Sequence, residues 1–328
     1  MKTIIAEETI LDDLIKTFHH LFDLNVLEST PIKRGWLNLK WKITTDSGQF
    51  LLKQYNEKRY KMYNTEDLLF VFTQQVRLYN KGIRCPNLLS HNENILLESK
   101  NGERFMVMEF CQGKVISPGK ANVHQMYDLG KETGKMHRLL NDGTLDIKDN
   151  PKFIPPCREE RLEHWDSVWK QAKETDEIQL LTYIEAQRKA TEDFNMGKFE
   201  SLQLGWAHRD LWVDNLLFDN KGLTAILDFD RLNYDYPELD VARAIMSCAL
   251  DENFDVSLAL AFIEGYSEEC SISEGYLTNA LQLLWYMEST WWTNYYMNQH
   301  SLPPARFAKE MIWLAENQKN LSDLLGNI

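Results

Sequence analysis

The sequence is poor in cysteine and has no closely spaced pair of cysteines. Its five cysteines are scattered along the chain, and none lies in a C-x-x-C spacing: Cys85, Cys111, Cys157, Cys248 and Cys270. An odd number without close pairs fits reduced thiols better than a disulfide scaffold or a zinc site. We therefore expect a cytoplasmic protein.

Long apolar runs are also missing. No run approaches the roughly 18 apolar residues that a membrane span needs. The first residues mix Glu7, Glu8, Asp12 and Asp13 into their apolar positions, unlike the apolar segment of a signal peptide. We expect neither a membrane span nor a leader peptide.

Basic residues are outnumbered by acidic ones, 36 to 49, which gives a formal net charge of −13. This charge repels polyanions such as DNA, so we expect no nucleic-acid partner. It would attract a small cationic substrate, although acidic surfaces are also an ordinary means of staying soluble. Nothing in the composition indicates the oligomeric state.

Two common phosphate-binding loops are absent. The stretch from Gly113 to Lys120 has five residues between its glycines and continues with Ala121, so it is not the GxxxxGK[ST] loop. No strand is followed by GxGxxG, which argues against a dinucleotide-binding fold.

The pattern of apolar residues changes along the chain and predicts an α+β fold. A helix at 3–22 is followed by strands, with one further helix, which we expect to begin at Thr65 as its N-cap. The rest is mainly helical. The expected strands are 25–33, 39–44, 50–55, 94–98, 104–110, 216–218 and 225–227; the expected helices are 65–81, 122–140, two within 165–199, and those after 239. We predict a small N-terminal lobe at 1–110 and a larger helical lobe at 111–328.

The most informative stretch is AHRDLWVDNLLFDNKGLTAILDFD, residues 207–230. Asp210 lies five residues before Asn215, which lies thirteen before Asp228. These offsets match the catalytic loop of kinases and the metal-binding Asp that follows it. An ordinary loop with capping Asp and Asn residues is the competing interpretation, and it does not explain the two apolar strands around the turn.

Phosphoryl transfer explains why these residue types are needed. Negative charge gathers on phosphate oxygens, and Mg²⁺ bridges such oxygens through hard oxygen ligands. Asp228 supplies a carboxylate and Asn215 an amide oxygen for the metal. Asp210 would accept a hydrogen bond from the attacking hydroxyl and take its proton.

The same stretch resembles the aminoglycoside phosphotransferase and choline kinase family, distant relatives of protein kinases, and the resemblance covers nearly the whole chain. It implies a bilobal, protein-kinase-like fold and the use of ATP and Mg²⁺ by a small-molecule kinase. HRDLWVDNLLF and the layout of the N-terminal lobe also resemble the homoserine kinase branch of this family. Only a short segment separates Asp228 from YPELDVARA, so the long activation segment of a protein kinase is missing.

The resemblance carries nucleotide-binding roles to particular residues. Lys53, in the strand FLLK, would contact the α- and β-phosphates, or it is a strand-edge solubility lysine. The acid that pairs with this lysine would be Glu66 or Asp67, both near the start of the next helix, with Glu66 favoured. An acid at this position that only stabilises the helix dipole is the alternative. Gly35 and Asn38 lie where the phosphate-covering turn should be, although a plain hairpin turn is as compatible with them. Adenine would bind to backbone groups of the segment that joins the lobes, at Glu109, Phe110 and Cys111.

The acceptor site is less specified. Trp285, Glu288 and Trp292 could hold an ammonium group by cation–π and ionic attraction, although aromatics at helical spacing are more often core residues. The resemblance further implies that Asp240 supports the catalytic loop. We interpret His137 as a packed or capping residue and His208 as a brace.

Two departures from the family pattern stand out. Arg209 occupies the position between the His and the Asp that usually holds glycine, and Asp230 stands where Gly or Glu is common. Neither removes a reacting group. The sequence thus predicts a kinase that phosphorylates a hydroxyl of a small, cationic molecule such as an amino-alcohol, homoserine or an aminosugar. The alternative is a catalytically silent, kinase-like structural or binding protein of the spore-coat type.

Overall fold

The computed structural model describes residues 2–33, 38–61, 64–175, 178–299 and 304–326. It divides into two compact units. The first runs to Lys114 and also contains Thr224–Asp230, and the second comprises Val115–Leu223 and Arg231–Ile328. The sequence-predicted boundary at residue 110 thus lies close to the end of the first long segment, whereas the return of Thr224–Asp230 to the first unit was not predicted.

The first unit is built on an antiparallel sheet. Its strands are ordered β1-β2-β3-β6-β4, and β5 also pairs with β6. Their bounds are β1 (Val26–Pro31), β2 (Leu39–Thr45), β3 (Gly48–Gln54), β4 (Leu88–Leu89), β5 (Leu97–Glu98) and β6 (Arg104–Glu109). The turn signal between the second and third strands gives the predicted hairpin, with Leu39 opposite Gln54 and Thr45 opposite Gly48.

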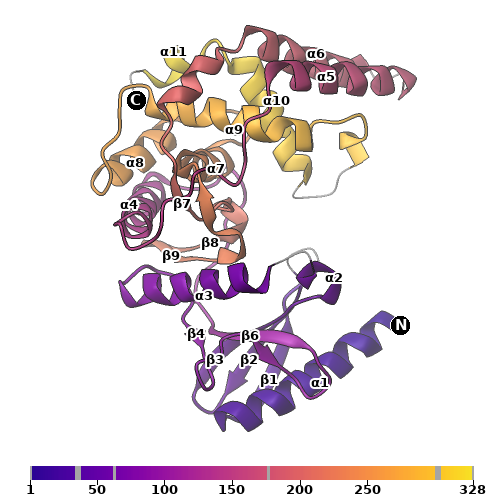
Figure 1. Ribbon diagram of the computed structural model, residues 1–328, viewed down its shortest axis with the longest axis vertical. Coiled ribbons are helices and arrows are strands. Elements are labelled where there is room, and N and C mark those ends of the chain that lie inside the picture. The colour runs from indigo at the N-terminus through magenta and orange to yellow at the C-terminus, as the bar shows by residue number, and fades with distance from the viewer. Residues whose placement is uncertain (1, 34–37, 62–63, 176–177, 300–303, 327–328) are drawn as a thin grey trace. The chain divides into compact units, whose positions relative to one another are not determined.

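One face of this sheet packs on α1 (Lys2–Phe22), which runs beside β1 and β2 in Figure 1. Alternate strand residues bury against the apolar side of the helix, because successive side chains of a strand point to opposite faces. The core contains Leu14, Phe18, Trp41, Ile43, Leu52, Leu97, Phe105 and Val107. The other face of β2 and β3 carries Lys40 and Lys53.

Two further helices belong to the first unit: the short α2 (Glu57–Tyr60) and the longer α3 (Thr65–Asn80). The predicted N-cap at Thr65 is wrong by one residue. Asn64 is the N-cap, and its side chain accepts a hydrogen bond from the amide of Glu66 at 2.9 Å. Asn is as good a cap as Thr, so the two neighbouring residues could not be separated by type alone.

The second unit is mainly helical, as predicted. Its helices are α4 (Val123–Leu140), α5 (Arg158–Ala172), α6 (Ile178–Asp193), α7 (Pro237–Ala249), α8 (Val256–Ser267), α9 (Tyr276–Trp292), α10 (Pro304–Asn317) and α11 (Leu321–Leu325). Its strands are β7 (Gly205–Ala207), which pairs with β10 (Asn233–Asp235), and β8 (Leu216–Asp219). Strand β8 forms a hairpin with β9 (Gly222–Ile226), whose residues from Thr224 onward belong to the first unit. Helix α5 begins before the predicted start at 165, because Cys157 and Glu160 form a capping box there.

Helices α4 and α8 approach each other closely. A Cβ atom at Gly130 would collide with the carbonyl of Phe262, and one at Gly265 would collide with the carbonyl of Tyr127. Glycine at both positions is therefore what allows this helix contact. Within the described part of the chain, no helix combines the length and apolar character of a membrane span, and no disulfide joins the cysteines.

Candidate active site

Asp210 and Asn215 lie in the loop between β7 and β8 in the second unit. The amide of Trp212 donates to the Asp210 carbonyl at 2.9 Å, and the amide of Asn215 donates to the Trp212 carbonyl at 2.8 Å. The side-chain Nδ2 of Asn215 donates to the main-chain oxygen of Asp210 at 2.9 Å and to its Oδ2 at 3.0 Å. The loop thus brings the predicted base and one predicted metal ligand together.

One face of α7 holds this loop. Both carboxylate oxygens of Asp240 accept backbone hydrogen bonds, from His208 at 2.6 Å and from Arg209 at 2.8 Å. Two helical turns further on, Ser247 Oγ accepts a hydrogen bond from the amide of Val213 at 2.9 Å. Residues seven apart lie on the same face of a helix, so α7 satisfies three buried loop amides. The predicted support by Asp240 is confirmed.

Asp240 is fully buried, but its neighbours favour the ionised form of its carboxyl group. Burial alone would raise its pKa, but His137, with Arg243 and His208, lowers the pKa below its usual value. The ring Nε2 of His137 lies 3.2 Å from Asp240 Oδ2. His208 Nδ1 accepts a hydrogen bond from the amide of Asp210 at 3.2 Å. Both histidines therefore pack and brace, as the sequence indicated.

Arg209 stands where the family resemblance predicts a glycine. Its φ is +68°, a left-handed conformation that glycine adopts without strain. The side chain is anchored: Nε donates to Asp235 Oδ2 at 2.6 Å, Nη1 donates to the Arg231 carbonyl at 3.2 Å, and the guanidinium lies 4.3 Å from the ring centre of Phe153. Burial lowers the pKa of Arg209 and raises that of Asp235, and the ion pair opposes both shifts.

A second helix also contacts the loop, and no motif in the sequence predicts this contact. Arg306 on α10 donates a hydrogen bond to the carboxylate of Asp214, the residue before Asn215. The same guanidinium lies 3.1 Å, through Nε, from Glu310 Oε1. Glu310 is only 1% exposed, and burial raises its pKa to about 8, more than the attraction of Arg306 lowers it.

Lys53, Asp228 and Asp230 lie together in the first unit. Lys53 Nζ donates to Asp228 Oδ1 at 2.9 Å and to Asp230 Oδ2 at 2.7 Å. The hydroxyl of Tyr55 donates to the other oxygen of Asp230 at 3.1 Å. Asp230, the second departure from the family, is therefore a direct partner of the predicted phosphate-binding lysine.

This cluster is buried and strongly charged. Burial would lower the pKa of Lys53, which is 3% exposed, but attraction to Asp228 and Asp230 raises it well above the usual value. Lys53 therefore carries a positive charge at neutral pH. Asp228 has a φ of +61°, which is uncommon for a residue other than glycine and is found at functional sites.

Three further nucleotide-binding predictions have different outcomes. Glu66 is exposed at the start of α3, and its amide donates to the N-cap Asn64. The acidic partners of Lys53 in the structure are Asp228 and Asp230. Asn38 is 8% exposed, and its Oδ1 accepts a hydrogen bond from the amide of Asn56 at 3.2 Å. Gly35 lies outside the described residues. The roles of all three stay predictions.

The segment predicted to bind adenine follows β6. The amide of Glu109 donates to the Asn87 carbonyl, and that of Phe110 donates to the Gln49 carbonyl at 3.0 Å. These two N–H groups are therefore used inside the first unit. Among the described residues, no acceptor is found for the amide of Cys111, and the adenine contact expected of this segment stays a prediction. Burial and Glu109 raise the pKa of the Cys111 thiol to about 11.

The residues proposed for a cationic acceptor are buried on α9. Glu288 is 3% exposed; its Oε1 accepts from Arg243 Nε at 2.9 Å, and its Oε2 accepts from Trp292 Nε1 at 3.1 Å. Trp285 is fully buried and donates to Gln187 Oε1 at 2.6 Å. The structure gives Glu288 a cation from within the chain, and it places Trp285 in the core, as the alternative interpretation described.

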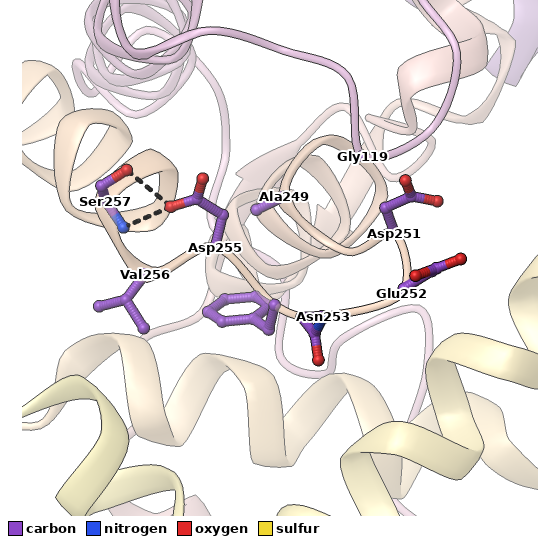
Figure 2. Close-up of a pocket in the computed structure, with 9 residues that line it drawn as sticks. Gly119, Ala249, Asp251, Glu252, Asn253, Asp255, Val256 and Ser257 are labelled. Atoms are coloured by element: carbon purple, nitrogen blue, oxygen red, sulfur yellow. Dashed lines mark hydrogen bonds between the residues drawn. The ribbon is translucent and has the colours of Figure 1, made fainter.

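A cavity of about 560 Å³ lies elsewhere in the second unit, lined by Gly119, Ala249 and residues 251–257. Figure 2 shows Asp255 there, accepting hydrogen bonds from the amide and hydroxyl of Ser257. Asp255 is the N-cap of α8, so this acidic loop has a structural role. None of the predicted site residues lines the cavity. Among the described residues, no group of three His, Cys, Asp or Glu side chains could hold a metal ion.

Comparison with known proteins identifies the class. A model described as the phosphotransferase enzyme family matches residues 28–277, so the chain belongs to this family and is a small-molecule kinase. A homoserine kinase of Rhodopseudomonas palustris (strain BisA53) is 27% identical over 262 residues, which are 78% of this chain and 74% of that protein.

Solved structures support the fold. An aminoglycoside phosphotransferase of Alicyclobacillus acidocaldarius superposes with a TM-score of 0.66 at 14% identity, covering 93% of each chain. A choline kinase of Cryptosporidium parvum gives 0.57 at 16% identity, covering 97% of this chain and 98% of that one. The predicted family resemblance and the α+β, kinase-like fold class are confirmed.

Proposed function

We propose that this chain transfers the γ-phosphoryl group of ATP, with Mg²⁺, to a hydroxyl of homoserine or a similar small amino-alcohol. The observation that carries the proposal is the loop in which Asn215 and α7 hold the Asp210 carboxylate in place. The names of the relatives and the net charge of −13 support an acceptor that bears an ammonium group.

Asn215 and Asp228 offer oxygen atoms of the kind that the expected metal ion binds. Asn215 uses its Nδ2 for Asp210, and no described residue donates to its Oδ1, so an amide oxygen remains for a metal. Asp228 offers a carboxylate, and oxygen atoms of these two kinds suit Mg²⁺. When bound, Mg²⁺ would offset the negative charge of the phosphate oxygens.

The side chains have separate tasks in the reaction. Asp210 accepts a hydrogen bond from the acceptor hydroxyl, which orients the oxygen, and it takes the proton as the new O–P bond forms and the bond to the leaving ADP breaks. The Lys53 ammonium binds phosphate oxygens as a point charge. Asp240 and Ser247 keep the Asp210 loop in one conformation, which lowers the entropy cost of reaching the transition state.

The test measures ADP production with a panel of homoserine, amino-alcohols and aminoglycosides. We expect turnover with at least one amino-alcohol, and Asp210→Asn should lower kcat by about 10³-fold because proton transfer and orientation are lost. Asp149→Asn, an exposed site, is the matched control and should retain full activity. ATP binding without turnover on any acceptor would favour the silent, structural alternative. Absence of both turnover and divalent-dependent ATP binding would overturn the proposal.

A further inference from the structure

The hairpin of β2 and β3 places two lysines directly opposite each other. Lys40 pairs with Lys53 in the register, on the sheet face opposite the one covered by α1. Cross-strand partners have Cβ atoms about 5 Å apart, and like charges at such positions are destabilising. A compensating negative charge is therefore needed between them.

Asp228 provides this charge. Its Oδ1 lies 2.9 Å from Lys53 Nζ and its Oδ2 lies 3.7 Å from Lys40 Nζ, so each carboxylate oxygen faces one ammonium group. Asp230 adds a second carboxylate on the Lys53 side, at 2.7 Å. Two ammonium groups and two carboxylates thus lie together in the first unit, and the Asp228 carboxylate faces both lysines.

The two lysines differ in depth. The side chain of Lys53 is 4% exposed and that of Lys40 is 21% exposed. Lys53 is thus fixed at the bottom of the cluster, while Lys40 presents its ammonium group nearer to the surface. If Asp228 also held a metal cation, its carboxylate would share its charge with that cation and would neutralise the two ammonium groups less completely. A polyanion restores the balance.

We propose that Lys40 is a second phosphate-binding cation of the nucleotide site, acting beside Lys53. This inference rests on the proposed function, because it needs a nucleoside triphosphate as ligand. Lys40 binds the polyphosphate and makes no contribution to binding of the nucleoside. Its effect should therefore grow with the number of phosphates.

The experiment measures dissociation constants of ATP, ADP and adenosine for the full chain, with Mg²⁺ present. Lys40→Met should weaken ATP by about 10-fold or more and ADP by less, and it should leave adenosine unchanged. Lys40→Arg keeps the charge and should recover most of the ATP affinity. Lys16→Met, an exposed lysine of α1 on the opposite side of the sheet, should change none of the three constants.

Two results would overturn the inference about Lys40 without contradicting the proposed function. If the unmodified chain binds ATP and Lys40→Met binds it equally well, the inference about Lys40 is overturned while the kinase proposal stands. Equal weakening of ATP and adenosine would also overturn it, because this would show that Lys40 only stabilises the sheet. If the unmodified chain binds no ATP, the proposed function fails first.

Discussion

Arg209 shows how a single residue departs from a family pattern at a cost that its neighbours offset. A left-handed backbone at a residue other than glycine costs on the order of 1 kcal/mol. The guanidinium recovers this through Asp235, the Arg231 carbonyl and the ring of Phe153. The position thus combines backbone strain with a buried ion pair beside the predicted catalytic base.

Substitutions at Arg209 should separate these two contributions. Arg209→Ala removes the ion pair and keeps the strain, whereas Arg209→Gly removes both. We expect both variants to be destabilised, by about 3 kcal/mol for Ala because Asp235 is left buried without its partner, and by about 1 kcal/mol less for Gly. Urea unfolding measures the difference.

A double variant serves as the control. Adding Asp235→Asn to Arg209→Gly removes the uncompensated carboxylate and should recover part of the lost stability. Equal stability of Arg209→Gly and Arg209→Ala would show that the positive φ at this position carries no strain.

Local spacing explains which site residues could be predicted from the sequence. Asp210 and Asn215 are five residues apart, so a motif defines their contact. Arg243 and Glu288 are 45 residues apart and meet through the packing of α7 against α9, which no local pattern specifies. A Glu288→Gln variant therefore tests more than a cation pocket, because it also removes the counter-ion of buried Arg243.

At the scale of elements, two helices from different positions in the chain hold the loop that carries Asp210. Helix α7 binds loop amides through Asp240 and Ser247, and α10 binds the Asp214 carboxylate through Arg306. The contribution of α7 could be predicted from YPELDVARA because the segment closely follows Asp228, the predicted metal ligand. That of α10 could not, since Arg306 is 92 residues away from Asp214.

Glu310 on α10 should make stability depend on pH. Its folded pKa of about 8 lies above the ordinary value of 4.5. Below pH 4.5 both states hold the proton, so there is no penalty. As pH rises from 4.5 to 8 the unfolded chain releases the proton while the folded chain keeps it, so the free energy of unfolding falls by about 1.4 kcal/mol per pH unit.

The measurement is urea unfolding at several pH values from 5 to 8. Glu310→Gln should flatten the decline in the free energy of unfolding, because glutamine does not titrate. Glu316→Gln, an exposed acid on the same helix, should keep the slope of the unmodified chain. An unchanged slope in Glu310→Gln would contradict the assignment of the pH dependence to this residue.

At the scale of the whole molecule, each of the two units holds a self-contained part of the predicted chemistry. The first carries the two lysines with Asp228 and Asp230. The second carries Asp210 and Asn215 with their supporting helices. The longer strands and helices were predicted from periodicity and turn residues, whereas the short elements α2, β4, β7 and β10 were not, because two to four residues carry too little periodicity. The return of Thr224–Asp230 to the first unit was not predicted either, because that assignment depends on contacts such as the hydrogen bond from Ile226 N to the Arg84 carbonyl.

Phosphorus NMR of the chain with ATP, Mg²⁺ and homoserine tests the central claim most directly. The account predicts that ATP is replaced by ADP and by an equal amount of a new phosphomonoester of the acceptor, and that Asp210→Asn leaves the ATP spectrum nearly unchanged over the same time. Amino-alcohols tried in place of homoserine should give the corresponding phosphomonoester if one of them is the better acceptor. Unchanged ATP with every acceptor, or release of inorganic phosphate alone, would contradict it.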